Sequence, residues 1–418
     1  SQSLDMGTAN SVAEMIDGSA ATGVLTVITD NANATTVKTG SANDSITSTG
    51  GTATVVTIES GAGDDTITHT ANLGSTDVIN GGDGTDTLVG TTANLKALAV
   101  SATAPTITNM EAVTVSDAYV DTTSTIDIIG DIQATGITTV TLANVDTTAG
   151  DDITTGDEVL VMGSGAMTLN LGGSEAGNQS HLGGTLEVQD TGTATTDSLA
   201  IVNKALNSTT GANVDIVDVA GAALGKAITS TGYESVSLDT GAGSANTEQG
   251  FSTLTITPDA VASNVSLTLT GTNAIDIISG VSTTSTGLLT INASGLTAQA
   301  AGTTTFDLNS TTQGTAGTAT ITGSGGDDLI TIGNFASTIN AGAGTDVIVG
   351  GTAADTISGD AGNDTITGSG GNDTLNGGAG NDTITASTAG NYTVTGGDGT
   401  DSVDFGGTLT QNDSFDGG

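Results

Sequence analysis

The amino-acid sequence predicts an all-β protein in which blocks of short parallel strands, coiled as a β-roll or β-helix, flank an irregular β-solenoid or β-module region. Three observations predict this fold. Nonapeptides rich in glycine and aspartate repeat without a gap near the C-terminus, a looser version stands near the N-terminus, and apolar and polar residues alternate between them. A short fixed period and a period-two alternation are both typical of stacked strands.

Seven consecutive nonapeptides begin at Gly323. Their apolar residues follow one another at intervals of nine, from Ile330 to Ile384. Two positions before the apolar residue stands an aspartate, except in the second repeat, which has Ser337. After a one-residue slip near Asn391 the pattern returns at Asp401. The sequence therefore predicts a β-roll over 321–405 and a C-terminal tail over 406–418.

The chemistry of each nonapeptide divides it into a turn and a strand. The glycines of the turn supply backbone angles that a Cβ forbids, and the apolar residue of the following strand points inward. Two nonapeptides make one coil, so residues eighteen apart stack at about 4.8 Å. We expect Asp346, Asp364 and Asp382 to line one edge of the roll, with Asp355 and Asp373 on the other.

A related block is predicted over 39–90, after an N-terminal segment at 1–38. Asp44, Asp65 and Asp86 each precede an apolar residue by two positions, and Asp77 does so nine residues before Asp86. Val56 stands where another aspartate is expected. The spacings alternate between nine and twelve, which indicates three-residue insertions. For Asp44 and Asp77, an ordinary turn before a strand remains an alternative.

The region 91–320 loses the repeat but keeps the composition. Segments such as ITTVTLANV (137–145) alternate apolar and polar residues, which predicts half-buried strands. Only 93–100 and 198–207 could instead be short helices. We therefore expect a Thr-, Ala- and Gly-rich β region that is either one long solenoid or a stack of irregular modules.

Stacked carboxylates repel one another unless a cation lies between them. Calcium suits such an edge, because it accepts six to eight oxygen ligands in flexible geometry, whereas magnesium demands a tight octahedron. The repeats offer neither Cys nor His to a softer metal. The predicted calcium ligands are Asp44, Asp65, Asp77, Asp86, Asp328, Asp346, Asp355, Asp364, Asp373, Asp382 and Asp401.

The composition limits the partners. The formal charge is -42, and 38 of the 46 acidic residues are Asp, the other eight being Glu. This charge argues against nucleic acid and anionic lipid as partners, although an acidic, salt-adapted surface would share it. No apolar run is long enough for membrane insertion. The N-terminus lacks an initiator Met and a signal segment, so we expect a processed product or one part of a longer protein.

No catalytic constellation is recognisable in the sequence. His69 and His181 are far apart and lie outside any H-E-x-x-H motif, and there is no G-x-S-x-G elbow and no cysteine. Neighbouring acids such as Asp64 and Asp65 are better explained as turn residues or metal ligands than as an acid–base pair. We therefore expect no enzyme and no catalytic residues.

The nonapeptides resemble RTX repeats, whose GGxGxDxUx consensus is matched throughout by GGAGNDTIT. A turn with D-x-L followed by a strand carrying Glu occurs twice, as NGGDGTDTLVG with ITNMEAVTVSD and as TTDSLAIV with STGYESVSLDT. This pairing is similar to RTX-type bacterial surface-layer (S-layer) proteins. The resemblance implies a secreted protein of the bacterial cell surface that self-assembles into a calcium-dependent lattice.

The same resemblance leaves an RTX-type adhesin, or an extracellular filament or biofilm matrix protein, as the alternative. The implied partners are further copies of the chain, and cell-surface polysaccharide through a part outside this sequence. The acidity of the repeats further suggests that they stay unfolded where calcium is scarce and fold outside the cell, because metal binding then contributes folding free energy.

Overall fold

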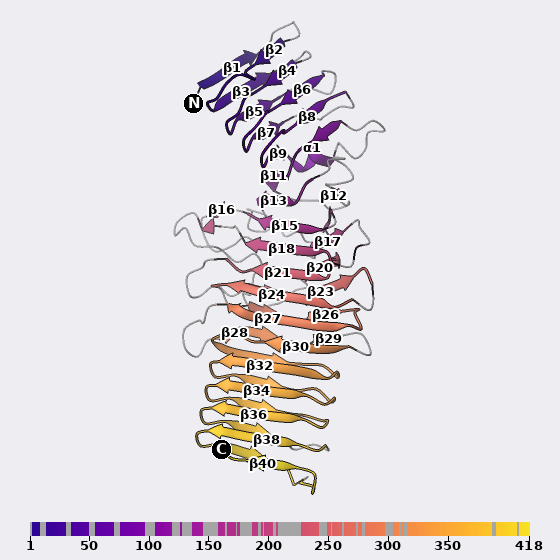
Figure 1. Cartoon of the computed structure of the whole chain (residues 1–418), viewed down its shortest axis with the longest axis vertical. Coiled ribbons are helices and arrows are strands. Elements are labelled where there is room, and N and C mark those ends of the chain that lie inside the picture. The colour runs from indigo at the N-terminus through magenta and orange to yellow at the C-terminus, as the bar shows by residue number, and fades with distance from the viewer. Residues whose placement is uncertain are drawn as a thin grey trace. The chain divides into compact units, whose positions relative to one another are not determined.

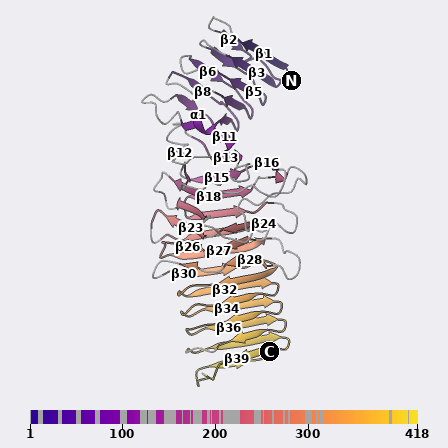
Figure 2. The same ribbon diagram turned by 180° about the vertical axis from the view of Figure 1, so that it is seen from behind.

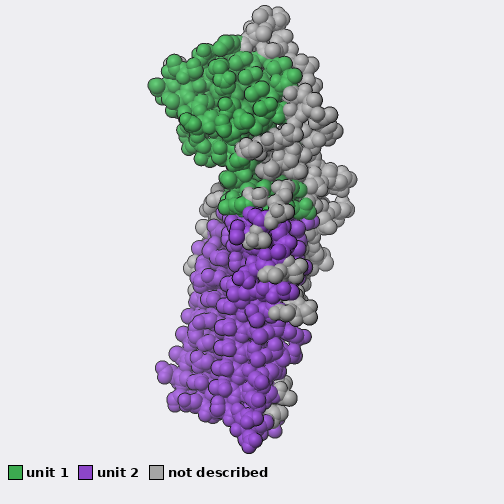
Figure 3. All heavy atoms as spheres, turned by 45° about the vertical axis from the view of Figure 1, so that its right-hand side comes forward, with its two compact units in different colours: residues 1–148, 158–173, 189–191 green, residues 149–157, 174–188, 192–418 purple. Residues whose placement is uncertain are grey.

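The computed structural model describes most of the chain as stacked parallel strands. The described residues are 2–8, 14–30, 35–49, 55–70, 76–96, 105–118, 126–127, 136–144, 158–163, 165–172, 174–175, 186–190, 194, 196–203, 206–207, 227–241, 249–251, 253–260, 263–272, 275–277, 281–296, 304–308, 311–312, 317–386, 390–407 and 409–418. They fall into two compact units, which Figure 3 distinguishes by colour. Unit 1 comprises 1–148, 158–173 and 189–191, and unit 2 comprises 149–157, 174–188 and 192–418.

Unit 1 is built from two parallel sheets whose strands alternate along the chain (Figure 1). The first sheet contains β1 (Gln2–Thr8), β3 (Leu25–Asp30), β5 (Ser45–Ser48), β7 (Thr66–His69), β9 (Thr87–Gly90), β11 (Ala112–Ala118), β13 (Thr139–Asn144) and β15 (Ala166–Leu171). The second contains β2 (Glu14–Asp17), β4 (Thr35–Lys38), β6 (Val56–Glu59), β8 (Val78–Asn80) and β10 (Thr106–Thr108). A short pair, β12 (Ile126–Asp127) with β14 (Glu158–Met162), follows.

The coil of unit 1 is 21 residues long where it is most regular. Ile46 lies beside Ile67, and Ile67 lies beside Leu88, in the parallel register of β5, β7 and β9. All three side chains are buried. The nine-plus-twelve spacing thus closes one coil, as the sequence predicts.

One helix interrupts the strands of unit 1 within its described residues. Helix α1 (Thr92–Lys96) overlaps the start of the segment 93–100, for which the sequence allows a helix. Its Leu95 is 3% exposed and packs over Gly90 at the end of β9. The helix therefore covers the end of an inward-facing strand.

Unit 2 also pairs its described strands in parallel, and Figure 2 shows them as successive rungs from behind. Its largest sheet contains β18 (Ser198–Asn203), β21 (Ser235–Asp239), β24 (Val265–Gly271), β27 (Leu288–Leu296), β30 (Thr318–Thr322), β32 (Ser337–Ala343), β34 (Thr356–Ala361), β36 (Thr374–Ala379), β38 (Thr393–Asp398) and β40 (Ser414–Asp416). Facing strands are β22 (Gln249–Phe251), β25 (Ile275–Ile277), β28 (Thr304–Leu308), β31 (Asp327–Thr331), β33 (Val347–Val349), β35 (Thr365–Thr367), β37 (Thr383–Thr385) and β39 (Ser402–Asp404).

Shorter strands complete unit 2. They are β20 (Ala227–Gly232), β23 (Thr253–Pro258), β26 (Val281–Thr283) and β29 (Thr311–Thr312) in one sheet, and the pair β16 (Ser174–Glu175) with β19 (Leu206–Asn207). Strand β17 (Leu186–Asp190) lies at the division between the two units in the sequence. The all-β prediction is therefore confirmed.

The eighteen-residue coil of the C-terminal roll is confirmed by its strand register. Ile339 lies beside Ile357 on one sheet, and Ile348 lies beside Ile366 on the other. The apolar residues predicted to point inward, from Ile330 to Ile384, are at most 1% exposed. Strand β40 pairs with β38, so stacking continues into the segment 406–418.

The alternative prediction of a short helix at 198–207 is wrong. Residues 198–203 form strand β18, in which Leu199, Ile201 and Asn203 are buried and alternate with partly exposed residues. The apolar positions of SLAIVNKALN fit either period over so short a stretch. Pairing with β21 in parallel register decides in favour of the strand.

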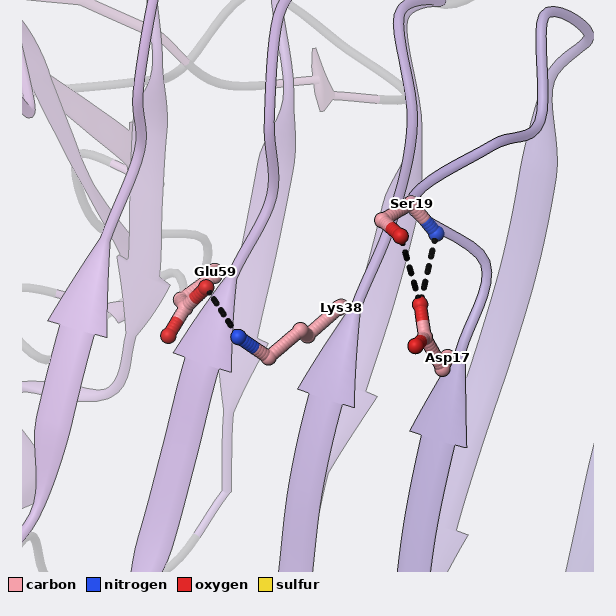
Figure 4. Close-up of polar contacts among 4 residues, drawn as sticks. All are labelled: Asp17, Ser19, Lys38 and Glu59. Atoms are coloured by element: carbon pink, nitrogen blue, oxygen red, sulfur yellow. Dashed lines mark hydrogen bonds and ion pairs between the residues drawn. The ribbon is translucent and has the colours of Figure 1, made fainter.

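The surface of unit 1 carries an ion pair that fits its register. Lys38 on β4 donates to Glu59 Oε2 on β6 at 2.7 Å (Figure 4). The Glu59 hydrogen bond raises the pKa of Lys38. On β2, hydrogen bonds from the Ser19 hydroxyl and backbone N–H lower the pKa of Asp17. Because like positions stack in register, a lysine between two acids avoids the repulsion that identical neighbours would create.

Candidate metal centres

One edge of the C-terminal roll carries a continuous ladder of aspartates. The backbone N–H of each donates to Oδ1 of its counterpart in the next coil: Asp328 to Asp346 at 2.8 Å, Asp346 to Asp364 at 2.9 Å, Asp364 to Asp382 at 2.9 Å, and Asp382 to Asp401 at 3.0 Å. Asp328 is the second residue of β31, and each of the other four immediately precedes a strand of the same sheet, which fixes the spacing of the ladder.

The opposite edge is a shorter ladder. Asp355 N–H donates to Asp373 Oδ1 at 2.9 Å, and both the N–H and the hydroxyl of Ser337 donate to Asp355 Oδ1. Tyr392 occupies the next aspartate position, because Thr374 pairs with Thr393. Its ring is 1% exposed and its hydroxyl donates to the Ser369 carbonyl at 3.0 Å. This rung offers a phenol where its neighbours offer a carboxylate.

Unit 1 repeats the arrangement. The N–H of Asp44 donates to Asp65 Oδ1 at 2.6 Å, and that of Asp65 donates to Asp86 Oδ1 at 2.8 Å. The Leu25 N–H begins this ladder by donating to Asp44. On the other edge Val56 N–H donates to Asp77 Oδ1 at 2.8 Å. The structure thus places the predicted ligands at the start of their strands, and Oδ1 of Asp44 and of Asp77 accepts a backbone N–H as in the other ladder aspartates.

The second carboxylate oxygen of most ladder aspartates is buried and accepts no hydrogen bond. Among the described residues this holds for Oδ2 of Asp86, Asp346, Asp364, Asp373, Asp382 and Asp401. A buried oxygen without a partner costs free energy, and a metal ion removes that cost. Asp44, Asp328 and Asp355 differ, because their Oδ2 atoms accept the backbone N–H groups of Gly40, Ser324 and Gly351. The row of unbonded oxygens is the observation that fits a cation best.

Glycines keep the space beside these oxygens open. A Cβ added to Gly377 would collide with Asp382 Oδ2 and lie 2.5 Å from the carbonyl oxygen of Gly396. A Cβ on Gly359 would collide with Asp364 Oδ2 and lie 2.7 Å from the carbonyl oxygen of Gly377. The space beside each glycine, called a cradle below, is therefore bordered by a carboxylate oxygen of its own turn and by a carbonyl oxygen of the next coil. An all-oxygen donor set of this kind is the one calcium prefers.

Burial also changes the acidity of the ladder. Desolvation raises the pKa of Asp346 to about 7 and the pKa values of Asp364, Asp373 and Asp65 to about 6, against the hydrogen bonds that lower them. Neighbouring carboxylates add to the rise. Without a cation, the folded edge therefore keeps its protons to a higher pH than free carboxyl groups do.

This shift predicts an unusual pH dependence for the calcium-free chain. A folded-state pKa above the unfolded value near 3.9 means that the folded state binds more protons between about pH 4 and pH 7, so stability rises as the pH falls through that window. In EDTA we expect more strand signal from the C-terminal roll at about pH 5 than at pH 7, where the calcium-free roll should unfold. With saturating calcium the roll should instead be more stable at pH 7, because protons compete with the ion at pH 5. Less strand signal at pH 5 than at pH 7 in EDTA would contradict the burial argument.

A second ladder, which the sequence reasoning missed, runs along the outside of the turns. Asn363 Oδ1 accepts the N–H of Asn381 at 2.7 Å, and Asn381 Oδ1 accepts the N–H of Thr400 at 2.8 Å. In unit 1, Asn43 and Asp64 do the same for Asp64 and Thr85. Here the acceptor belongs to the earlier coil, whereas in the inner ladder it belongs to the later one. The signal was present as the Asn or Asp that precedes several ladder aspartates.

No helix among the described residues is long and apolar enough to cross a membrane. No curated protein and no solved structure matches the chain. A family model, the RTX calcium-binding nonapeptide repeat, matches in four copies at 74–94, 313–331, 333–357 and 349–384. Three of these copies fall in unit 2 and one falls in unit 1, where the ladders lie. The chain therefore contains RTX repeats arranged as parallel β-roll, and it is a calcium-binding protein of the extracellular type.

Proposed function

We propose that this chain is a structural protein of a bacterial surface layer, secreted and assembled outside the cell, in which calcium drives both folding and self-assembly. The observation that carries the proposal is the row of buried, unbonded aspartate oxygens along a stiff parallel roll. An ion held there lies between turns of the scaffold, where it stabilises stacked coils. Its role is accordingly structural, and the chain acts without catalysis.

The charge supports assembly through calcium rather than through direct contacts. Copies of a chain with a formal charge of -42 repel one another unless cations neutralise the surfaces they bring together. Exposed acids beyond the ladders, such as Asp83, Asp398 and Asp404, are available for such neutralisation. Calcium at concentrations above those that saturate the turn sites would then bridge neighbouring copies of the chain.

Electron microscopy of the purified chain with calcium, with equimolar magnesium, and with EDTA tests this proposal. We expect two-dimensional sheets in calcium and dispersed chains in the other two conditions. Filaments in calcium would favour a matrix fibre over a surface layer. Monodisperse particles at every calcium concentration would favour an adhesin. Either result would overturn the lattice.

A further inference from the structure

The aspartate ladder of unit 1 ends at Asp86 in an irregular coil. Asp86 is 0% exposed, its Oδ1 accepts the N–H of Asp65, and its Oδ2 is buried with no hydrogen-bond partner. The residue opposite Asp86 in the next coil is Glu111, because Ala112 pairs with Thr87. The offset is 25 residues rather than 21, so nonapeptide counting does not find it.

Glu111 takes the position and the hydrogen bond of a ladder aspartate. Its Oε2 accepts the Asp86 N–H at 2.8 Å, as Oδ1 of the next aspartate does elsewhere. Glu111 in turn donates its own N–H to the Asp86 carbonyl at 3.1 Å. Met110 beside it is fully buried, which anchors the turn. The carboxylate of Glu111 therefore lies at the next rung.

The cradle at this rung matches those of the C-terminal roll. A Cβ added to Gly81 would lie 2.5 Å from Asp86 Oδ2 and would collide with the carbonyl oxygen of Asn109. At Gly359 and Gly377 the same two kinds of oxygen border the glycine, one from its own aspartate and one from the next coil. Residue 109 is the register partner of Gly81, because Asn80 pairs with Thr108.

The backbone of Asn109 is held in the shape that this cradle needs. Its φ is 52°, in the left-handed region that residues other than glycine seldom adopt, and asparagine tolerates it best. Its side-chain amide donates to Asn80 Oδ1 at 2.8 Å, which fixes the turn. The described residues contain only two other non-glycine residues with positive φ, Asp360 near the end of β34 and Ser369 after β35, and both belong to the C-terminal roll.

We propose that the turn at 81–86 and the turn at 109–111 hold a calcium ion outside the nonapeptide period, with Asp86 Oδ2, the Glu111 carboxylate and the Asn109 carbonyl oxygen as protein ligands. Asp83 and Asp64 also carry negative charge close to Asp86, so a bound cation would reduce the repulsion among these carboxylates. The site does not depend on lattice assembly. Glu111 is a ligand that neither the aspartate pattern nor the matched repeat, which ends at residue 94, includes.

The motif that carries Glu111 recurs in unit 2 with different hydrogen bonding. Glu234 Oε2 accepts the Asp197 N–H at 3.2 Å, and Glu234 Oε1 accepts the Asp259 N–H at 3.2 Å. Both oxygens of Glu234 thus serve backbone groups, whereas one backbone N–H bonds Glu111. The sequence pairing of D-x-L with a following Glu therefore predicts stacking at both places, and the two glutamates differ in how many backbone N–H groups they accept.

Calcium counting by equilibrium dialysis on the full chain tests the site. Glu111→Gln keeps an oxygen to accept the Asp86 N–H but removes the charge, and we expect one ion fewer per chain, or one site weakened about tenfold or more. Glu59→Gln makes the same change of net charge on the surface and should leave the count unchanged. An unchanged count and affinity in Glu111→Gln would overturn the proposal.

Hydrogen exchange separates loss of the ion from loss of the fold. In EDTA, Glu111→Gln should leave the Asp86 amide as protected as in the parent chain. On addition of calcium, protection across 78–115 should rise in the parent and in Glu59→Gln, but not in Glu111→Gln. An equal rise in all three chains would show that Glu111 binds no calcium.

Discussion

Removal of calcium with EDTA at neutral pH is expected to unfold the C-terminal roll between 317 and 404. An ion held at about 0.1 mM affinity contributes about 1.4 kcal/mol per site at millimolar calcium. Several sites along one ladder then contribute as much as the 5–15 kcal/mol by which a typical domain is stable. The carboxylates left behind repel at the spacing of adjacent strands, with their Oδ2 atoms buried and unbonded.

Circular dichroism and hydrogen exchange of the full chain, titrated with calcium, check this expectation. Strand signal and amide protection in 317–404 should appear together as calcium is added, and magnesium at the same concentration should not replace it. Full protection of this region in EDTA would show that the roll folds without metal.

Substitution of Asp364 by Ala is expected to destabilise its own coil and both neighbours. The Asp346 N–H loses its buried acceptor, which costs about 1–3 kcal/mol, and the cradles beside Gly359 lose a carboxylate ligand. We expect the calcium concentration at the folding midpoint to rise several-fold, with hydrogen exchange increased over residues 346–385.

Two further variants separate the loss of the calcium ligand from the loss of the hydrogen bond. Asp364→Asn retains an oxygen for the Asp346 N–H but loses the charge, so in EDTA it should behave like the parent, while the calcium concentration at its folding midpoint should still rise. Ser337→Ala removes one hydroxyl hydrogen bond at a rung without a carboxylate and should cost only about 0.5–1.5 kcal/mol. Equal damage from Ser337→Ala and Asp364→Ala would contradict the assigned role of the ladder.

The repeat period predicts the regular parts of the fold because each coil reuses one hydrogen-bond pattern. Eighteen-residue stacking, the inward row from Ile330 to Ile384 and the two aspartate edges all follow from that period. The hydrogen bonds that join one aspartate to the next do not follow, since a sequence shows which carboxylates stack but not which backbone groups they accept.

The remaining departures occur where the coil length changes. Tyr392 stands at an aspartate position only because a one-residue insertion moves the register, and Glu111 stands opposite Asp86 only because a longer coil carries helix α1. Both positions can be assigned only once it is known which strands pair. At 198–207, a strand forms where a short apolar run fits two periods, and only its neighbours in the sheet distinguish them.

The most direct test of the calcium ladder is a crystal structure of the calcium-loaded chain with anomalous diffraction from the ion. We expect calcium between successive turns along the edge from Asp328 to Asp401, within about 2.3–2.6 Å of the Oδ2 atoms of Asp346, Asp364 and Asp382. Anomalous density confined to surface acids, with those oxygens still unbonded, would contradict it.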